Sequence, residues 1–167
     1  MRLFLAVRLS PEICRTLLAA QEALRRQGAR GSFSRPENFH VTLAFLGETE
    51  NERGARNAMD AACNGGAFPL ELSGVGNFGQ LRWVGVRSGG RLEELALRLQ
   101  DALRAQGFAL EERPFRPHIT LVRRLSVPCP PLSDLPHTAM TVDAVSLMRS
   151  ERIRGVLTYT ELWRKKL

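Results

Sequence analysis

Two short stretches of the chain repeat the same order of a histidine and a threonine. They are His40-Val41-Thr42-Leu43 and His118-Ile119-Thr120-Leu121, and they contain two of the three histidines in the sequence. An imidazole has an ordinary pKa of about 6.5, so it can give or take a proton near neutral pH. Two imidazoles that face each other can therefore act as an acid and a base, while the two threonine hydroxyls bind an anion such as a phosphate.

Both stretches alternate polar and β-branched or apolar residues, which is typical of half-buried β-strands. Successive side chains of a strand point to opposite faces, so His40 shares a face with Thr42, and His118 shares one with Thr120. The apolar residues between and after them are predicted to point into a core. These are Val41, Leu43, Phe45, Ile119 and Leu121.

The first part of the chain supplies the elements that position the first motif. We expect a strand over Leu3–Leu9, a helix from Ser10-Pro11 to about Gln27, a short extended piece at Ser32–Ser34, the motif strand ending at Gly47, a helix over Glu50–Cys63 and a strand over Phe68–Phe78. Leu3, Leu5 and Val7 are predicted to face the helices. This leaves Phe4 on the side of His40 and Thr42.

The second part of the chain restarts with a strand and a helix. We expect a strand over Leu81–Val86, a helix over Gly90–Gln106, an irregular connection at Phe108–Phe115, the second motif strand over Pro117–Arg124, a proline-rich loop (Pro128, Pro130, Pro131, Pro136) and two strands over Met140–Arg149 and Val156–Trp163 that form a hairpin. The repeated order predicts an α+β fold in one bilobal domain, residues 1–167. Its halves, 1–79 and 80–167, are predicted to form pseudo-symmetric antiparallel sheets with helices outside and a cleft between them.

The charge of the chain favours an anionic partner. There are 24 Lys and Arg against 17 Asp and Glu, a net charge of +7, and most of the positive residues are arginines. Arginine suits bidentate contact with phosphate, so RNA is a candidate partner. A general replacement of lysine by arginine in the genome explains the composition equally well.

The cysteine and hydropathy patterns limit the cellular compartments in which the protein is expected. Cys14, Cys63 and Cys129 form no CxxC pair, which argues against a zinc knuckle or a disulfide framework and favours a reducing cytoplasm. The first ten residues read as a strand and not as a signal peptide, and no stretch has the ~20 apolar residues of a membrane span.

The motifs have no neighbouring Asp, Glu or Cys, and His137 is expected to be exposed in the proline-rich loop. We therefore expect no metal and no cofactor.

The two motifs and their flanks resemble a known family, the two-histidine (2H) phosphoesterases. The similar segments are Pro36-Glu37-Asn38 before the first motif, Phe115-Arg116-Pro117 before the second, Trp83-Val84-Gly85-Val86, and Arg149-Ser150 in the closing hairpin. Within that family the chain is most similar to the RNA 2′,3′-cyclic phosphodiesterases, which are also called 2′-5′ RNA ligases. Met148 departs from the pattern, because an aromatic residue is expected before Arg149.

The resemblance implies a hydrolase that opens a terminal 2′,3′-cyclic phosphate of RNA to a 2′-phosphomonoester without a metal. His40 would be the proton donor to the 3′ oxygen, and His118 the proton acceptor that activates water. Thr42, Thr120 and Arg123 would bind the phosphate. No obligate protein partner is implied, and a monomer is expected.

Three points stay open in the sequence. Strict alternation places Arg124, not Arg123, on the face of His118, unless a bulge or the strand's end reverses the order. Phe4 either stacks on a terminal base or packs between the lobes. The same catalytic groups would also serve a 2′-5′ phosphodiesterase or a reversible 2′-5′ RNA ligase. A non-catalytic RNA-binding domain is a further alternative, but binding alone would not require both histidines.

Overall fold

The computed structural model describes residues 1–126, 131–132 and 135–167. Cys129 and two residues of the predicted proline-rich loop, Pro128 and Pro130, lie outside the described residues. The elements are β1 (Arg2–Arg8), α1 (Pro11–Arg26), β2 (Ser32–Phe33), the 3-10 turn η1 (Pro36–Asn38), β3 (His40–Glu48), α2 (Glu52–Ala62), β4 (Phe68–Phe78), β5 (Leu81–Arg87), α3 (Arg91–Ala105), β6 (His118–Arg123), β7 (Ala139–Val142), β8 (Ala144–Ile153) and β9 (Val156–Lys166). None of the helices in these ranges has the length and apolar character needed to cross a membrane.

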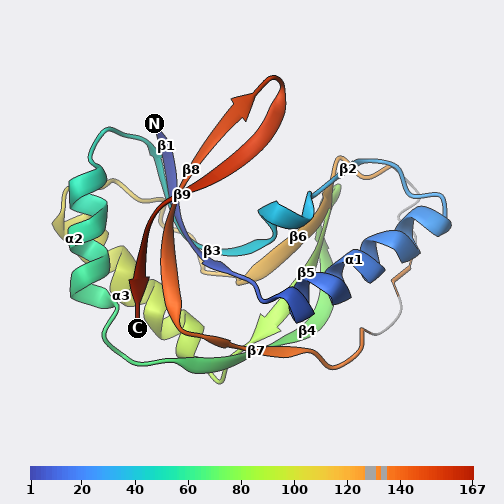
Figure 1. Ribbon diagram of the computed structural model, residues 1–167, viewed down its shortest axis with the longest axis horizontal. Helices are drawn as coiled ribbons and strands as arrows, with labels where there is room; N and C mark the ends of the chain where they lie inside the picture. Colours follow the sequence, from blue (N-terminus) through green and yellow to red (C-terminus); the bar gives the residue numbers. More distant parts are fainter. Residues whose placement is uncertain (127–130, 133–134) are drawn as a thin grey trace.

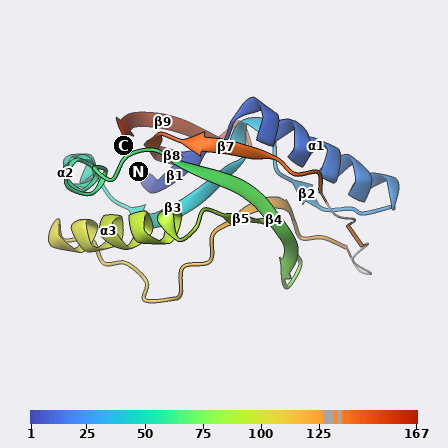
Figure 2. The ribbon, with the colours of Figure 1, turned by 90° about the horizontal axis from the view of Figure 1, so that it is seen from below.

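The described strands form two antiparallel sheets. One has the order β3-β1-β8-β9, and the other has the order β2-β6-β5-β4-β7. Helices α2 and α3 lie on the side of the first sheet and α1 lies on the side of the second (Figures 1 and 2). The α+β prediction is confirmed, because both sheets are antiparallel and the helices pack outside them.

The two halves of the sequence exchange elements between the sheets. Strand β4 comes from the first half but pairs with β5 across the tight turn Gly79-Gln80, whereas β8 and β9 come from the second half and join β1. Helix α1 packs on β6 and β7, and α3 packs on β3. The expectation that residues 1–79 form one lobe and 80–167 the other is therefore wrong for the sheets. A two-residue turn holds its flanking strands together, and here it spans the expected boundary.

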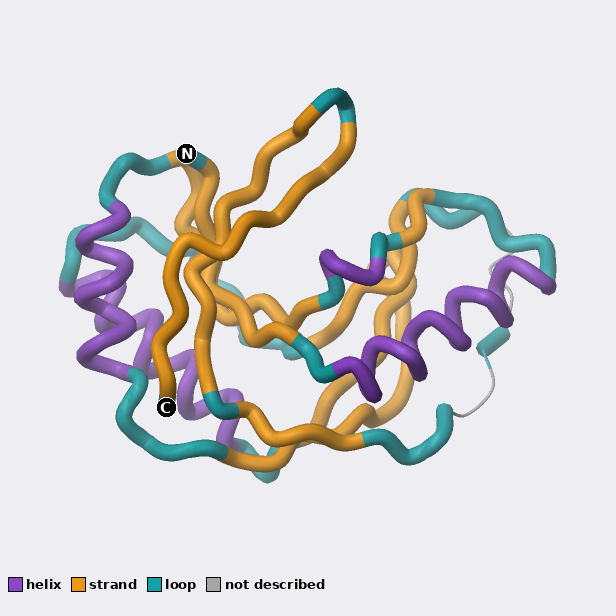
Figure 3. Tube along the Cα trace, in the orientation of Figure 1, coloured by secondary structure: helices purple, strands orange, loops and turns teal. Residues whose placement is uncertain are grey.

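The single strand predicted over Met140–Arg149 is two strands, one in each sheet. Strand β7 pairs with β4, and β8 pairs with β1 and β9. Asp143 lies between them, and its carbonyl accepts a hydrogen bond from the Leu167 amide at 2.9 Å while its carboxylate pairs with Arg164 at 3.2 Å. The apolar pattern on both sides of Asp143 is that of a continuous strand, so the sequence carries no turn signal here. The closing hairpin of β8 and β9 extends beyond the body of its sheet (Figure 3).

Helix α1 begins as predicted. The Ser10 hydroxyl accepts a hydrogen bond from the Ile13 amide at 3.2 Å, and Pro11 occupies the first helical position, where a missing amide proton costs nothing. The buried stripe of the helix consists of Ile13, Leu17, Ala20, Gln21 and Leu24. Gln21 is the one polar member of that stripe.

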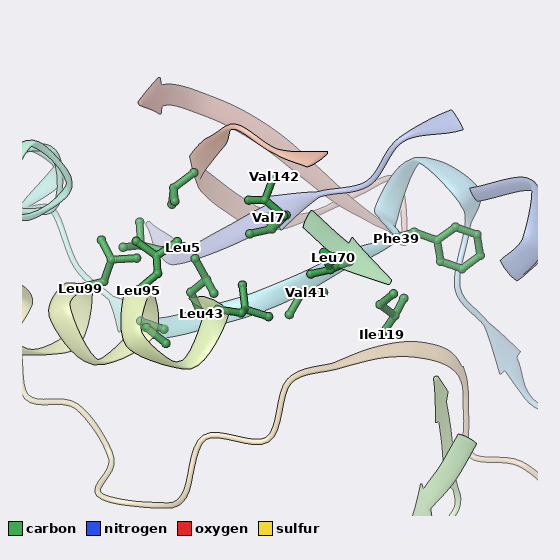
Figure 4. Close-up of a cluster of buried hydrophobic side chains, with 14 of the residues drawn as sticks. Leu5, Val7, Phe39, Val41, Leu43, Leu70, Leu95, Leu99, Ile119 and Val142 are labelled. Carbon is green, nitrogen blue, oxygen red and sulfur yellow. The ribbon is translucent and has the colours of Figure 1, made fainter. Parts of the chain in front are cut away.

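A continuous core fixes the two motif strands side by side. Strands β3 and β6 are in contact, and Val41 and Ile119, the residues between each histidine and its threonine, are both fully buried. They point into the same apolar cluster as Leu5, Leu43 and Leu95 (Figure 4). Burial of each such side chain stabilises the fold by about 1.5–3 kcal/mol. Since both strands turn their apolar sides to one core, their histidine sides face the same opening.

Candidate active site

The two motif histidines are held by the same backbone contact. Nδ1 of His40 lies 2.7 Å from the carbonyl oxygen of Asn38, and Nδ1 of His118 lies 2.6 Å from the carbonyl oxygen of Arg116. A carbonyl only accepts hydrogen bonds, so each Nδ1 carries a proton and donates. In both neutral rings the lone pair is therefore on Nε2, the atom that takes up or gives away a proton.

His40 lies in an apolar environment. Its ring centroid is 5.1 Å from that of Phe4 and 5.2 Å from that of Tyr159, and its Nε2 is 2.8 Å from Oγ1 of Thr42. The pKa of His40 is lowered to about 4, mainly by burial; the hydrogen bond to Asn38 raises it, and the charges of Arg123 and His118 add to the lowering. His40 is thus neutral at pH 7 in the free protein, and Thr42 donates its hydroxyl proton to Nε2. A bound phosphate would raise the pKa again.

His118 is bordered by a different aromatic pair. Its ring makes an edge contact with Phe78 at 5.1 Å and lies 6.2 Å from Trp83. The indole of Trp83 lies across Gly76 of the neighbouring strand, where an added Cβ would overlap the indole. Glycine at this position leaves the space that the indole occupies. Phe78 is 38% exposed, so one side of its ring is open to a ligand.

Both motif strands carry a β-bulge at the leucine of the motif. In β6, Thr120 pairs with Trp83 and Val122 pairs with Arg82, so Leu121 is an extra residue without a partner in β5. In β3, Thr42 pairs with Ala6 and Ala44 pairs with Leu5, so Leu43 is the extra residue. An extra residue reverses the alternation of the side chains that follow it. Leu43 and Ala44, like Leu121 and Val122, are consecutive and buried.

The bulges decide which side chains return to the histidine side. The fifth residue after each histidine does so, which is Arg123 in β6 and Phe45 in β3. Arg123 lines the groove described below. Phe45 is 59% exposed and lies 6.4 Å from the ring of Phe4. The prediction that Phe45 points into the core is therefore wrong, because it assumed unbroken alternation.

A groove of about 260 Å³ runs along the end of β6 and the closing hairpin. His40, Thr120 and Tyr159 line it, and its other lining residues are Ser32, Phe33, Ser34, Arg35, Asn38, Arg123, Arg124, Arg152 and Leu157. Arg35 pairs with Glu37, but no described carboxylate pairs with Arg123 or Arg124. Arg124 has a positive φ of 54°, which turns the chain at the strand's end, and it lines the groove together with Arg123. The groove is suited to an anion.

The remaining predicted residues lie at the margin of this groove or away from it. Thr42 reaches it through its hydrogen bond to His40. Phe4 is only 4% exposed and lies behind His40, which favours the packing interpretation over base stacking. His137 is exposed, as expected, and its Nε2 is 2.6 Å from a carboxylate oxygen of Glu71. Among the described residues, no group of three or more His, Cys, Asp or Glu side chains is arranged to hold a metal ion.

The sequence predicted one aromatic neighbour of the histidines, Phe4, but not the other three. Tyr159, Phe78 and Trp83 come from strands outside the motifs, and each contacts its histidine only through the folding of the sheets. The one local signal is the alternation of Leu157 and Tyr159 in the closing hairpin, since both line the groove.

Comparisons with known proteins identify relatives of the chain in sequence and in structure. The family model described as the 2′-5′ RNA ligase superfamily matches residues 9–154. The RNA 2′,3′-cyclic phosphodiesterase of Geobacillus stearothermophilus is 36% identical over 136 residues, which are 72% of this chain and 41% of that protein. The Escherichia coli K12 protein of the same name is 34% identical over 169 residues, 98% of this chain and 94% of that protein. The crystal structure of TT0787 of Thermus thermophilus superposes with a TM-score of 0.84 at 31% identity, covering 100% of this chain and 98% of that one.

Proposed function

This chain belongs to the 2′-5′ RNA ligase superfamily, and we propose that it is an RNA 2′,3′-cyclic phosphodiesterase. Two relatives that share about a third of its sequence have this name. The reaction is hydrolysis of the terminal cyclic phosphate of an RNA to a 2′-phosphomonoester. The proposal includes a cytoplasmic monomer that acts on RNA ends without an obligate protein partner.

The two histidines divide the proton transfers between them. Because Nδ1 of His118 donates to the Arg116 carbonyl, its Nε2 lone pair is free to take a proton from water as the water attacks phosphorus. The bond between phosphorus and the 3′ oxygen then breaks. His40, once protonated on Nε2, donates that proton to the departing 3′ oxygen. Atoms and charge balance. One water is consumed: its oxygen bonds to phosphorus and one of its protons goes to His118, while the proton of His40 goes to the 3′ oxygen.

The phosphate supplies the condition that His40 lacks in the free protein. Its lowered pKa leaves it neutral at pH 7, and an anion beside Nε2 favours the charged ring. The hydroxyl of Thr42 then accepts a hydrogen bond where it previously donated one. Thr120 and Arg123 bind the non-bridging oxygens, and the guanidinium stabilises the charge that grows on the pentacovalent phosphorus.

The observation that carries the proposal is the matched orientation of the two imidazoles. Each ring has its Nδ1 proton bound to a backbone carbonyl, so each presents Nε2 for proton transfer. His40 lines the arginine-rich groove, and His118 lies on β6, the strand from which Thr120 and Arg123 line it. A site that only binds RNA has no use for two rings held in the same tautomer. Acid–base catalysis on a phosphodiester uses both.

Product analysis tests the proposal directly. An oligonucleotide with a 2′,3′-cyclic phosphate end, incubated with the protein in EDTA, should give a 2′-phosphate end. A 3′-phosphate product would reverse the roles of the two histidines. No turnover at all, from protein shown to be folded by circular dichroism, would reject the proposed function.

A second activity, cleavage or formation of a 2′-5′ phosphodiester, has one observation in its favour. Phe78 is 38% exposed beside His118, the ring that would activate the attacking group, so a nucleoside has a surface to stack on at that side. In ligation a 5′ hydroxyl replaces water, and the same bond to the 3′ oxygen breaks. Cleavage of a 2′-5′-linked dinucleotide, measured beside hydrolysis of the cyclic phosphate, distinguishes this activity from simple hydrolysis.

A further inference from the structure

The two β-bulges share a second feature, which links each of them to a helix. The carbonyl oxygen of Leu121 accepts a hydrogen bond from the side-chain amide of Gln21 in α1 at 2.9 Å. The carbonyl oxygen of Leu43 accepts one from the side-chain amide of Gln100 in α3 at 3.1 Å. The extra residue of each motif strand is thus held by a glutamine. Moreover, each glutamine comes from the half of the chain that does not contain its motif.

Gln21 is buried where an apolar residue would be expected. It is 1% exposed in the stripe of α1 that otherwise consists of Ile13, Leu17, Ala20 and Leu24. Its amide also donates to the carbonyl of Ser34 at 2.8 Å, and the Ser34 amide donates to the Leu121 carbonyl at 2.9 Å. A buried amide is unfavourable unless its hydrogen bonds are made. These bonds join α1, the segment after β2 and the bulge of β6 into one unit.

Gln100 reaches a strand that has a free side. In the described sheet, β3 is the outermost strand and pairs only with β1. Leu43 is 1% exposed, so its backbone lies close to the core under α3. The amide of Gln100 supplies the donor that a neighbouring strand would otherwise supply. Gln100 thus donates to the carbonyl of Leu43 in the first motif strand, as Gln21 donates to the carbonyl of Leu121 in the second.

We propose that Gln21 and Gln100 are positioning residues of the active site, each fixing the bulge that sets its motif's side chains. The inference rests on the proposed function. Gln21 acts through Leu121 on His118, Thr120 and Arg123, and Gln100 acts through Leu43 on His40 and Thr42. If a bulge were lost, so that the alternation of the strand continued unbroken, the residues beyond it would change faces, and in β6 Arg123 would leave the groove.

Methionine substitutions test the glutamines, because methionine retains their length and removes the amide donor. Gln21→Met and Gln100→Met should each lower kcat/KM for the cyclic phosphate by about tenfold, as loss of a contact behind a catalytic group does. Gln27→Met is the matched control, since its amide donates to the carbonyl of Ala23 on the same helix and to that of Pro131, away from both motifs. Its kcat/KM should be unchanged. Gln21→Leu, which also lacks the donor and matches the apolar stripe of α1, is the second variant if Gln21→Met does not fold.

Double-mutant cycles separate positioning from general stabilisation. Gln21→Met combined with Arg123→Ala should be non-additive, because the glutamine acts largely through that arginine. Combined with Thr42→Ala, it should be additive. Gln100→Met should be non-additive with Thr42→Ala and additive with Arg123→Ala. Additivity in all four combinations would mean that the glutamines only stabilise the fold, and the proposal would be rejected.

Ring nitrogen NMR gives a result that does not depend on turnover. Gln21→Met should shift the ring ¹⁵N signals of His118 and leave those of His40 in place, and Gln100→Met should do the opposite. Equal shifts at both rings, or none, would overturn the proposal whether or not the protein hydrolyses cyclic phosphates. Absence of turnover in the wild-type protein, with the selective shifts present, would reject the proposed function and leave the positioning role standing.

Discussion

The two motif strands have the same backbone and unlike surroundings. In each, a carbonyl two residues earlier holds Nδ1 of the histidine, and a bulge follows the threonine. Around His40 lie Phe4 and Tyr159, and burial lowers its pKa to about 4. Around His118 lie Phe78 and Trp83. Five residues after the histidine, one strand presents Phe45 and the other Arg123.

This difference shows that geometry and proton affinity are set by separate parts of the molecule. The backbone gives both imidazoles the same hydrogen bond, whereas burial lowers the pKa of His40. In the proposed reaction His40 must carry a proton while His118 is neutral, so the bound phosphate must raise the pKa of His40 from its low value in the free protein. The strand of His40 lacks a cation of its own at the fifth position. The charge of Arg123, from the other strand, acts on it.

The largest expected effect comes from removing either ring. His40→Ala and His118→Ala should each lower kcat by about 10²–10⁴-fold, the range for loss of a general acid or base. RNA affinity should be nearly retained, because the arginines of the groove remain. Single-turnover hydrolysis and a filter-binding assay measure the two quantities. His137→Ala, which removes the exposed third histidine, is the control, and a comparable loss there would contradict the assignment.

The next largest effect is expected at Arg123 and Phe45, the residues five positions after the two histidines. Their substitution tests whether the cation and the aromatic ring have different roles. Arg123→Ala should lower kcat by about 100-fold, as loss of a group that stabilises transition-state charge does. Phe45→Ala should change kcat/KM by less than about tenfold, because a ring at this position contributes stacking at most. Arg124→Ala should raise KM and reduce its dependence on salt, with kcat unchanged. If Arg124→Ala lowered kcat more than Arg123→Ala, the order of the two arginines would be reversed.

The sequence predicted the parts of this comparison that depend on local pattern. Alternation identified the faces of His40, Thr42, His118 and Thr120, and the helix signals at Ser10 and Pro11 were correct. It failed at Phe45, because a bulge depends on what a strand pairs with and leaves no mark in the strand's own residues.

The sequence also could not predict which sheet an element would join. Helix α1 and Gln21 support the second motif, and α3 and Gln100 support the first, so each site side is assembled from both halves. Tyr159 reaches His40 from the last strand of the chain for the same reason. Such contacts follow from the order of the strands in the sheets, and that order is decided by the packing of the whole core.

A stability measurement against pH tests the low pKa of His40. The folded-state pKa of His40 is about 4 and the ordinary value is 6.5, so the unfolded chain binds a proton between these values and the folded protein does not. Stability should therefore be full above pH 6.5 and should fall as the pH drops through about 4. His40→Gln, which does not titrate, should lose less over this window, by about 2–3 kcal/mol. Urea unfolding at pH 7 and pH 4 measures the difference, and equal losses would contradict the low pKa.

The smallest effect concerns the ring behind His40. Phe4 is 4% exposed, so Phe4→Leu should lower the free energy of unfolding by about 1 kcal/mol and leave KM nearly unchanged, as expected for packing. It should also let water reach His40 and move its pKa, followed by NMR, from about 4 towards 6.5. Phe78→Leu on the other side should do little to stability, because that ring is partly exposed. A rise in KM of about tenfold for Phe4→Leu, without loss of stability, would instead assign Phe4 to a base of the substrate, since stacking contributes about 1–3 kcal/mol. In that case the apolar environment of His40 would be completed by the RNA, and the two sides of the site would differ less in the free protein than in the complex.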